Sequence, residues 1–273
     1  MNFDLFKKII DEIKGKTPAI RLSLRGEATL NKDFTKCIKY AKDNGIKEIS
    51  TLTHGFKLNL TFFKQIVDAG IDWITISVDG TYETYNKIRK PLKFEDLLKK
   101  IRDINDFKKL NKLKKPVIKI QGIWPAIAEN PQEFYDIFSN ISDQVAFNPL
   151  IDFNEKYDDL DDKIFIENFV CPQQYQRMVI GADGLVMKCS NDENNKEVVG
   201  DIKIQTVKSI WHGKKLNEIR NNHKNNTALK KSEVCKKCYI PRKIHPEKLK
   251  LKHKEITILN YSSKLKDIDV DKL

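Results

Sequence analysis

The sequence contains no long hydrophobic run and no low-complexity tract. Nowhere in its 273 positions do about eighteen apolar residues follow one another, so no membrane-spanning helix is expected. Hydrophobic residues make up 40% of the chain, which suffices for a sizeable core. The length fits either one large α/β domain or a main domain with a small appendage.

Arginine is scarce among the basic residues. Only seven of the 50 basic residues are Arg, although the formal net charge is +12. Proteins that bind nucleic acids commonly use Arg forks and interleaved aromatic side chains. The lysines are instead dispersed over segments with helical spacing, which indicates solvated helix faces. Nucleic acid is therefore not an expected partner, although the denser runs 108–115 and 248–254 are candidates for contact with an anionic substrate or surface.

Cysteine is also scarce, and its five residues form an odd number. No secretory signal peptide is recognisable, and both features favour a reducing compartment over a disulfide framework. The expected location is therefore the cytoplasm. Cys37 stands apart from the other four, on the apolar face of an expected helix, where we interpret it as a core thiol.

Apolar strands alternate with single amphipathic helices through the first 150 residues. The expected strands are 20–24, 46–52, 71–78, 117–123 and 144–148, and the expected helices are 5–13, 34–41, 62–67, 94–104 and 131–141. This alternation at crossover spacing predicts parallel βαβ units. The predicted fold class is α/β, with a partial parallel (β/α) barrel of about five units over residues 1–150 whose first strand is missing. In such sheets the functional residues lie at the carboxyl ends of the strands.

The rest of the chain divides by composition. Residues 151–170 include six acidic residues between positions 152 and 162 and are expected to form a linker. Residues 171–242 contain four cysteines and predict a small metal-binding domain. Residues 243–273 form a Lys-rich C-terminal tail, in which 255–261 are expected to form a strand or a short helix.

The four cysteines of this domain are Cys171, Cys189, Cys235 and Cys238. Asp183-Gly184 predicts a tight turn between two short apolar runs, so a hairpin would carry Cys189 back toward Cys171. The Cys235-Lys-Lys-Cys238 turn lets two sulfurs converge on one centre. Four thiols suit either a zinc ion or an iron–sulfur cluster, and ligand type alone does not decide between them.

The order of these features resembles the SPASM/twitch extension of radical S-adenosylmethionine (radical SAM) enzymes. The resemblance covers residues 171–242, and its motifs are Cys171, Gly184, Cys189, the Gly200-Asp201 pair, the Ser209-Ile-Trp-His-Gly213 segment and the Cys235-x-x-Cys238 pair. It implies that the four cysteines hold one auxiliary [4Fe-4S] cluster.

The strand ends of the first part resemble the SAM site of the same family. Arg25-Gly26-Glu27 is similar to its Gly-Gly-Glu segment, with Arg25 in place of the first Gly. Thr53-His54-Gly55 is similar to a Thr-Asn-Gly strand end, where His54 is a candidate proton carrier or, more simply, a turn residue. Ser77-Val-Asp79-Gly80 is similar to a Ser-x-Asp-Gly motif beside the cofactor ribose. The resemblance thus implies S-adenosyl-L-methionine as a cofactor, with Gly26, Glu27, Thr53, Ser77 and Asp79 around it.

The resemblance implies an enzyme that generates a 5′-deoxyadenosyl radical to modify a peptide or a carbohydrate-type small molecule. The family's Cys-x-x-x-Cys-x-x-Cys motif, which binds the SAM-cleaving cluster, does not occur in these 273 residues. We therefore expect either an N-terminally shortened product or a remnant without radical chemistry. The alternative is a non-catalytic binding protein, a partial barrel with a structural Cys₄ zinc site. The oligomeric state is left open.

Overall fold

The computed structural model describes residues 1–149 and 164–261, which divide into two compact units. The barrel unit comprises residues 14–149 and 248–256. The cysteine-rich unit comprises residues 1–13, 164–247 and 257–261. Of the expected linker, residues 151–163, which include all six acidic residues between positions 152 and 162, lie outside the described residues.

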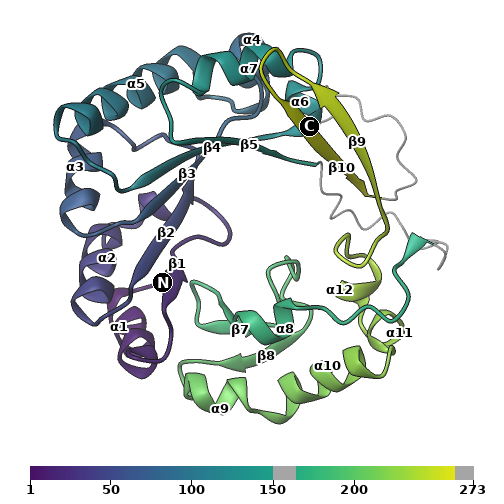
Figure 1. The fold of residues 1–273 in the computed structure, drawn as a ribbon. Helices are drawn as coiled ribbons and strands as arrows, with labels where there is room; N and C mark the ends of the chain where they lie inside the picture. Colours follow the sequence, from purple (N-terminus) through teal and green to yellow (C-terminus); the bar gives the residue numbers. More distant parts are fainter. Residues whose placement is uncertain (150–163, 262–273) are drawn as a thin grey trace. The chain divides into compact units, whose positions relative to one another are not determined.

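The barrel unit contains one five-stranded sheet in which all neighbouring strands are parallel. Its strands, in spatial order, are β1 (Ala19–Arg21), β2 (Glu48–Thr53), β3 (Trp73–Ser77), β4 (Val117–Ile123) and β5 (Gln144–Asn148). The intervening helical elements are η1 (Ala28–Leu30), α2 (Phe34–Asp43), α3 (Leu60–Asp68), α4 (Tyr82–Ile88), α5 (Phe94–Leu110), α6 (Trp124–Ile127) and α7 (Pro131–Phe138). Helices α2, α3 and α5 cover one face of the sheet (Figure 1). The predicted α/β fold with about five βα units is confirmed.

The apolar faces of the long helices explain why they cover the sheet. The residues that α2 buries are those with helical spacing in the sequence, namely Phe34, Cys37, Ile38 and Ala41. Helix α5 likewise buries Phe94, Leu97, Leu98, Ile101 and Ile104, together with Lys108. Opposite them, Ile74, Ile76, Ile118 and Ile120 on the central strands are almost fully buried. The expected core role of Cys37 is confirmed, since this thiol is 6% exposed.

Strand β1 is shorter than the predicted strand 20–24. The backbone N–H of Leu22 still donates to the Ser50 carbonyl at 2.8 Å. One residue later the Ser23 hydroxyl accepts the Leu52 N–H at 3.1 Å, so a side chain replaces the backbone partner of the ladder. The chain is thereby released toward Gly26 and Glu27.

The cysteine-rich unit combines short strands and helices around a small apolar core. It contains α1 (Phe3–Ile13), α8 (Gln173–Gln176), β6 (Val179–Ile180), β7 (Leu185–Met187), β8 (Val198–Asp201), α9 (Val207–Trp211), α10 (Lys214–Lys224), α11 (Ala228–Lys231) and α12 (Glu233–Lys236). Strands β6, β7 and β8 form an antiparallel sheet, and the first two make the predicted hairpin, with Gly184 at φ +88° in its turn. The core cluster joins Ile9 of α1 to Val186, Val199, Ile202 and Ile210. Helix α1 therefore packs on this hairpin sheet.

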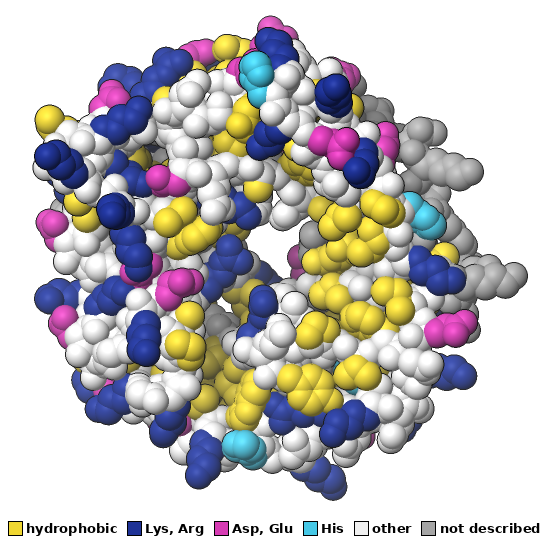
Figure 2. Space-filling view, viewed as in Figure 1, with side chains coloured by type: hydrophobic (Ala, Val, Ile, Leu, Met, Phe, Trp, Pro, Cys, Tyr) yellow, Lys and Arg dark blue, Asp and Glu magenta, His cyan; other side chains and the backbone are white. Residues whose placement is uncertain are grey.

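The Lys-rich tail begins as a hairpin of β9 (Ile244–Lys250) and β10 (Glu255–Tyr261). Its tip belongs to the barrel unit, where the Lys252 N–H donates to Gln132 Oε1 at 2.8 Å and Lys254 Nζ lies 4.2 Å from the Tyr135 ring centroid. Figure 2 shows Lys and Arg side chains dispersed over the visible face rather than gathered in one patch. Across residues 1–149 and 164–261, no helix has the length and apolar character that crossing a membrane would need.

Candidate functional site

The cysteine-rich unit brings four thiols together from separate segments of the chain. Cys171 precedes α8, Cys189 follows β7, Cys235 lies in α12, and Cys238 follows it. All four are free; the first three are buried and Cys238 is half-buried. Each thiol interacts electrostatically with at least one other: Cys171 with Cys235, and both Cys189 and Cys235 with Cys238.

Hydrogen-bond donors point at the sulfurs. Cys238 Sγ accepts from Asn191 Nδ2 at 3.1 Å and from the Ile240 N–H at 3.4 Å. Cys171 accepts from the backbone N–H groups of Gln173 and Gln174, where α8 begins, and Cys189 accepts from the Asn191 N–H. Such donors stabilise thiolates, and sulfurs that bind a metal or cluster are commonly surrounded in this way.

Burial disfavours the charged thiolate form of three of these cysteines. Burial raises the pKa of Cys189 to about 12 and that of Cys238 to about 11, and it also raises the pKa of Cys171. Binding of a metal or cluster must therefore displace protons from these three thiols, and the metal–thiolate bonds compensate for burying the thiolate charge.

The thiols are close but do not form a ready site for one ion. Among the described residues, no group of three or more His, Cys, Asp or Glu side chains could hold a metal ion. Around a tetrahedral zinc, with Zn–S bonds of about 2.3 Å, sulfurs stand about 3.8 Å apart. A cluster of several irons is wider than one ion and keeps its ligands farther apart. The donor set, four thiols with convergent N–H groups, fits an iron–sulfur cluster.

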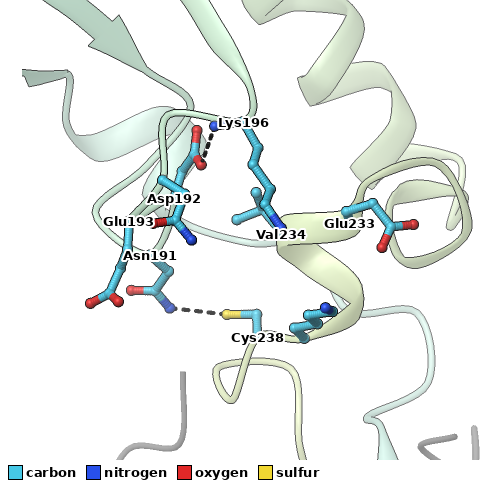
Figure 3. A pocket seen from close by; sticks show the side chains of 9 residues that line it. Asn191, Asp192, Glu193, Lys196, Glu233, Val234 and Cys238 are labelled. Carbon is cyan, nitrogen blue, oxygen red and sulfur yellow. Dashed lines mark hydrogen bonds between the residues drawn. The ribbon is translucent and has the colours of Figure 1, made fainter. Parts of the chain in front are cut away.

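A pocket opens beside Cys238 (Figure 3). It is lined by the loop Asn191–Lys196 and by residues of α12, including Glu233 and Val234. Within it the Asn191 amide reaches the Cys238 sulfur, and the Lys196 N–H donates to Asp192 Oδ1 at 2.8 Å (Figure 3). The loop after Cys189 is thus folded back onto the last cysteine of the set.

The second candidate site lies in the barrel unit, at the carboxyl end of β2. The Glu27 carboxylate accepts from the Thr29 hydroxyl at 2.5 Å, the Thr53 hydroxyl at 2.7 Å and the His54 N–H at 2.8 Å. Burial raises the pKa of Glu27, but these hydrogen bonds outweigh burial and hold the pKa below its ordinary 4.5. Glu27 is therefore an oriented, ionised carboxylate, and the structure brings it together with Thr53. Gly26, before it, has φ +68°.

His54 lies in the turn that follows β2, where its ring contacts both the backbone of the turn and Glu27. Its Nδ1 accepts the Phe56 N–H at 3.1 Å, so the ring proton resides on Nε2, which lies 3.4 Å from Glu27 Oε2. A Cβ on Gly55, which has φ +80°, would stand 2.4 Å from Leu97 Cδ1. These contacts support the interpretation of His54 as a turn residue that helps to hold Glu27.

Ser77 is the last residue of the next strand, β3, and Asp79 follows two residues later. Ser77 pairs in register with Gln121 at the carboxyl end of β3. Asp79 is 5% exposed and forms an ion pair with Arg89 of the segment after α4. A Cβ on Gly80, which has φ +90°, would stand 3.0 Å from the Ala126 carbonyl oxygen. Thr53 and Ser77 thus share one sheet edge, while Asp79 is engaged by a local partner.

The sequence did not single out the polar groups around Cys235. Lys188, Glu197, Ser232 and His223 surround that cysteine. One signal was available for Lys188, because this charged residue directly follows the apolar strand Leu185–Met187 and precedes Cys189. Ser232 lies three residues before Cys235 and caps α12, as a serine commonly does, so it did not stand out; Glu197 and His223 lie too far along the chain from Cys235 for spacing to indicate them.

Two family models match the chain. The model of the radical SAM superfamily matches residues 1–136, and SPASM, an iron–sulfur cluster-binding domain, matches residues 171–239. A curated relative, an Fe-coproporphyrin III synthase of Methanosarcina barkeri, is 28% identical over 83 residues. That match covers 30% of this chain and 21% of the relative's length.

Several solved structures share the fold at low sequence identity. BtrN in complex with AdoMet and 2-DOIA is 17% identical, with a TM-score of 0.57 over 87% of this chain and 80% of that one. Native anSMEcpe with bound AdoMet is 16% identical, with a TM-score of 0.61 over 87% and 78%. SuiB of Streptococcus suis, bound to S-adenosylmethionine, is 13% identical, with a TM-score of 0.51 over 86% and 62%.

Proposed function

The chain belongs to the radical SAM superfamily and carries a SPASM iron–sulfur domain, and on this basis we propose that it binds an auxiliary iron–sulfur cluster and takes part in the radical modification of a substrate. In this proposal Cys171, Cys189, Cys235 and Cys238 hold one [4Fe-4S] cluster. The edge formed by Glu27 and its neighbours holds S-adenosylmethionine. In the superfamily, bound S-adenosylmethionine supplies a 5′-deoxyadenosyl radical that abstracts a hydrogen atom from a substrate.

The thiol constellation carries the proposal. Four free cysteines from separate segments interact with one another, and backbone N–H groups converge on them. The remaining thiol, Cys37, is a core residue of the other unit and belongs to no such group. The model that matches residues 171–239 is that of an iron–sulfur cluster-binding domain, which favours a cluster over structural zinc.

The Glu27 site supports binding of the amino-acid part of S-adenosylmethionine. An ionised carboxylate in a fixed orientation suits an ammonium group. The Thr53 hydroxyl and the His54 N–H hold both carboxylate oxygens in place without adding charge. Ser77, one strand away at the same edge, and Gly26 complete the positions proposed for the cofactor, with Asp79 beside them.

The proposed substrate is a peptide or a carbohydrate-type small molecule. The support is analogy with structural neighbours: one structure of anSMEcpe contains a Cp18Cys peptide, and one of BtrN contains 2-DOIA.

Anaerobic reconstitution with iron and sulfide tests the cluster assignment. The wild-type chain should turn brown and bind about four irons. Cys235→Ala should lose the cluster, whereas Cys37→Ala, the matched control in the barrel unit, should keep it. A colourless protein that binds one zinc through the same cysteines would refute the cluster and support the structural metal site.

A further inference from the structure

A lysine is buried beside the proposed cluster ligands. Lys188 lies between β7 and Cys189, and its side chain is 1% exposed. Lysine is almost never buried to this degree unless its charge is paired, because removing an ammonium group from water is costly. The position therefore calls for a reason beyond packing.

The Lys188 ammonium has three partners, one of them a proposed ligand. Its Nζ donates to Glu197 Oε2 at 2.9 Å and to the Ser232 hydroxyl at 2.5 Å. It also forms a side-chain hydrogen bond with Cys235. Ser232 in turn donates to Glu197 Oε1 at 2.5 Å and accepts the Cys235 N–H at 3.1 Å, so the contacts fix the ammonium against that cysteine.

The positive charge at Cys235 comes from Lys188. Its side chain is 1% exposed and its ammonium lies 2.9 Å from Glu197 Oε2, so its charge is held in a buried ion pair. His223 also approaches, with Nε2 3.7 Å from Cys235 Sγ.

We propose that Lys188 is a positioning residue that sets the reduction potential of the auxiliary cluster through Cys235. The negative charge of Glu197 partly cancels the effect of the Lys188 charge. The inference rests on the proposed function. Reduction adds one electron to the cluster, and no bond forms or breaks. In a water-poor site a cation hydrogen-bonded to a ligand sulfur stabilises the more negative, reduced state and so raises the potential. The Glu197 carboxylate opposes this effect.

The test is a redox titration of the reconstituted 273-residue chain, followed by visible absorption and by the electron paramagnetic resonance signal of the reduced cluster. Lys188→Met should make one-electron reduction at least tenfold less favourable, which corresponds to a potential about 59 mV lower. Glu197→Gln should shift the potential upward, because it removes the opposing charge. Lys203→Met is the control, since that lysine is in the same unit but its side chain is 56% exposed.

The outcomes separate this inference from the proposed function. If the wild-type chain assembles no cluster, the proposed function fails. If all variants assemble the cluster but Lys188→Met and Glu197→Gln titrate like the wild type, the charge pair does not set the potential and the inference is wrong. If Lys188→Met loses the cluster, two other variants test the inference. Lys188→Arg keeps the positive charge and should keep a potential close to that of the wild type, whereas Glu197→Gln should have a higher potential. An unchanged potential in Glu197→Gln would overturn the inference.

Discussion

Gly200 lies so close to Ile210 that the loss of stability caused by a larger residue at position 200 can be predicted. A Cβ built on Gly200 would stand 2.6, 2.7 and 2.9 Å from three side-chain carbons of Ile210. Ordinary carbon contacts lie at about 3.5–4.0 Å, so the isoleucine would have to move by roughly 1 Å. Ile210 is 2% exposed and packs in the core cluster with Val186 and Ile202, so its displacement would disturb that packing.

We therefore expect Gly200→Ala to destabilise the unit by about 1–3 kcal/mol, the range for overpacked cores. Ile210→Ala alone should cost about 2–5 kcal/mol, because it creates a cavity. In the double variant the new methyl group enters the space vacated by Ile210, so the double loss should be smaller than the sum by at least about 1 kcal/mol.

The assay is urea denaturation of the four proteins of this cycle, followed by circular dichroism, with iron content after reconstitution as a second readout. Gly181→Ala in the β6–β7 hairpin serves as a control, since the nearest atom to its Cβ is the end of the Asp183 side chain. Additive losses, or wild-type stability of Gly200→Ala, would refute the steric reasoning.

Three further predictions concern the barrel unit and the activity. Asp72 is 6% exposed and accepts hydrogen bonds from Lys42 at 2.5 Å, Lys115 at 2.8 Å and the Ile49 N–H at 2.9 Å. Asp72→Asn should therefore lower the free energy of unfolding by about 2 kcal/mol. Urea denaturation measures this change, and equal stability of the two proteins would contradict it. The pKa of Glu27 is lowered on folding, so its stabilising effect is complete above the unfolded value of 4.5 and is lost as pH falls below it; Glu27→Gln should flatten this acid limb when unfolding is measured against pH. The 273-residue chain should release no 5′-deoxyadenosine from S-adenosylmethionine under reducing conditions, because it has no Cys-x-x-x-Cys-x-x-Cys motif, and chromatographic detection of that product would refute this.

Much of the barrel unit could be predicted from local periodicity. The apolar residues that α2 and α5 bury are the ones their helical spacing indicates, and the strands 117–123 and 144–148 have the predicted bounds. The strand at 20–24 was predicted too long, because the Ser23 hydroxyl takes over a backbone partner that periodicity does not reveal. Strand ends depend on single hydrogen bonds, whereas the existence of a strand depends on a whole pattern of side chains.

The environment of the candidate sites could be predicted only in part. Motif order indicated the four cysteines and the Glu27 segment, since metal ligands and strand ends recur at short, regular spacings. The Lys188–Glu197–Ser232 contacts were not predicted, because Lys188 and Ser232 are 44 positions apart and neither carries a motif. Likewise nothing in the first helix indicates that Ile9 would pack with Val186 and Ile210.

The sequence by itself determined the alternation of parallel strands with helices, the Asp183-Gly184 hairpin and the supply of four thiols, because each follows from residues close together in the chain. Only the tertiary structure decided which charges meet those thiols and that helix α1 packs on the hairpin sheet. Such contacts join segments far apart in sequence, and their partners are selected by burial and charge compensation over the whole unit.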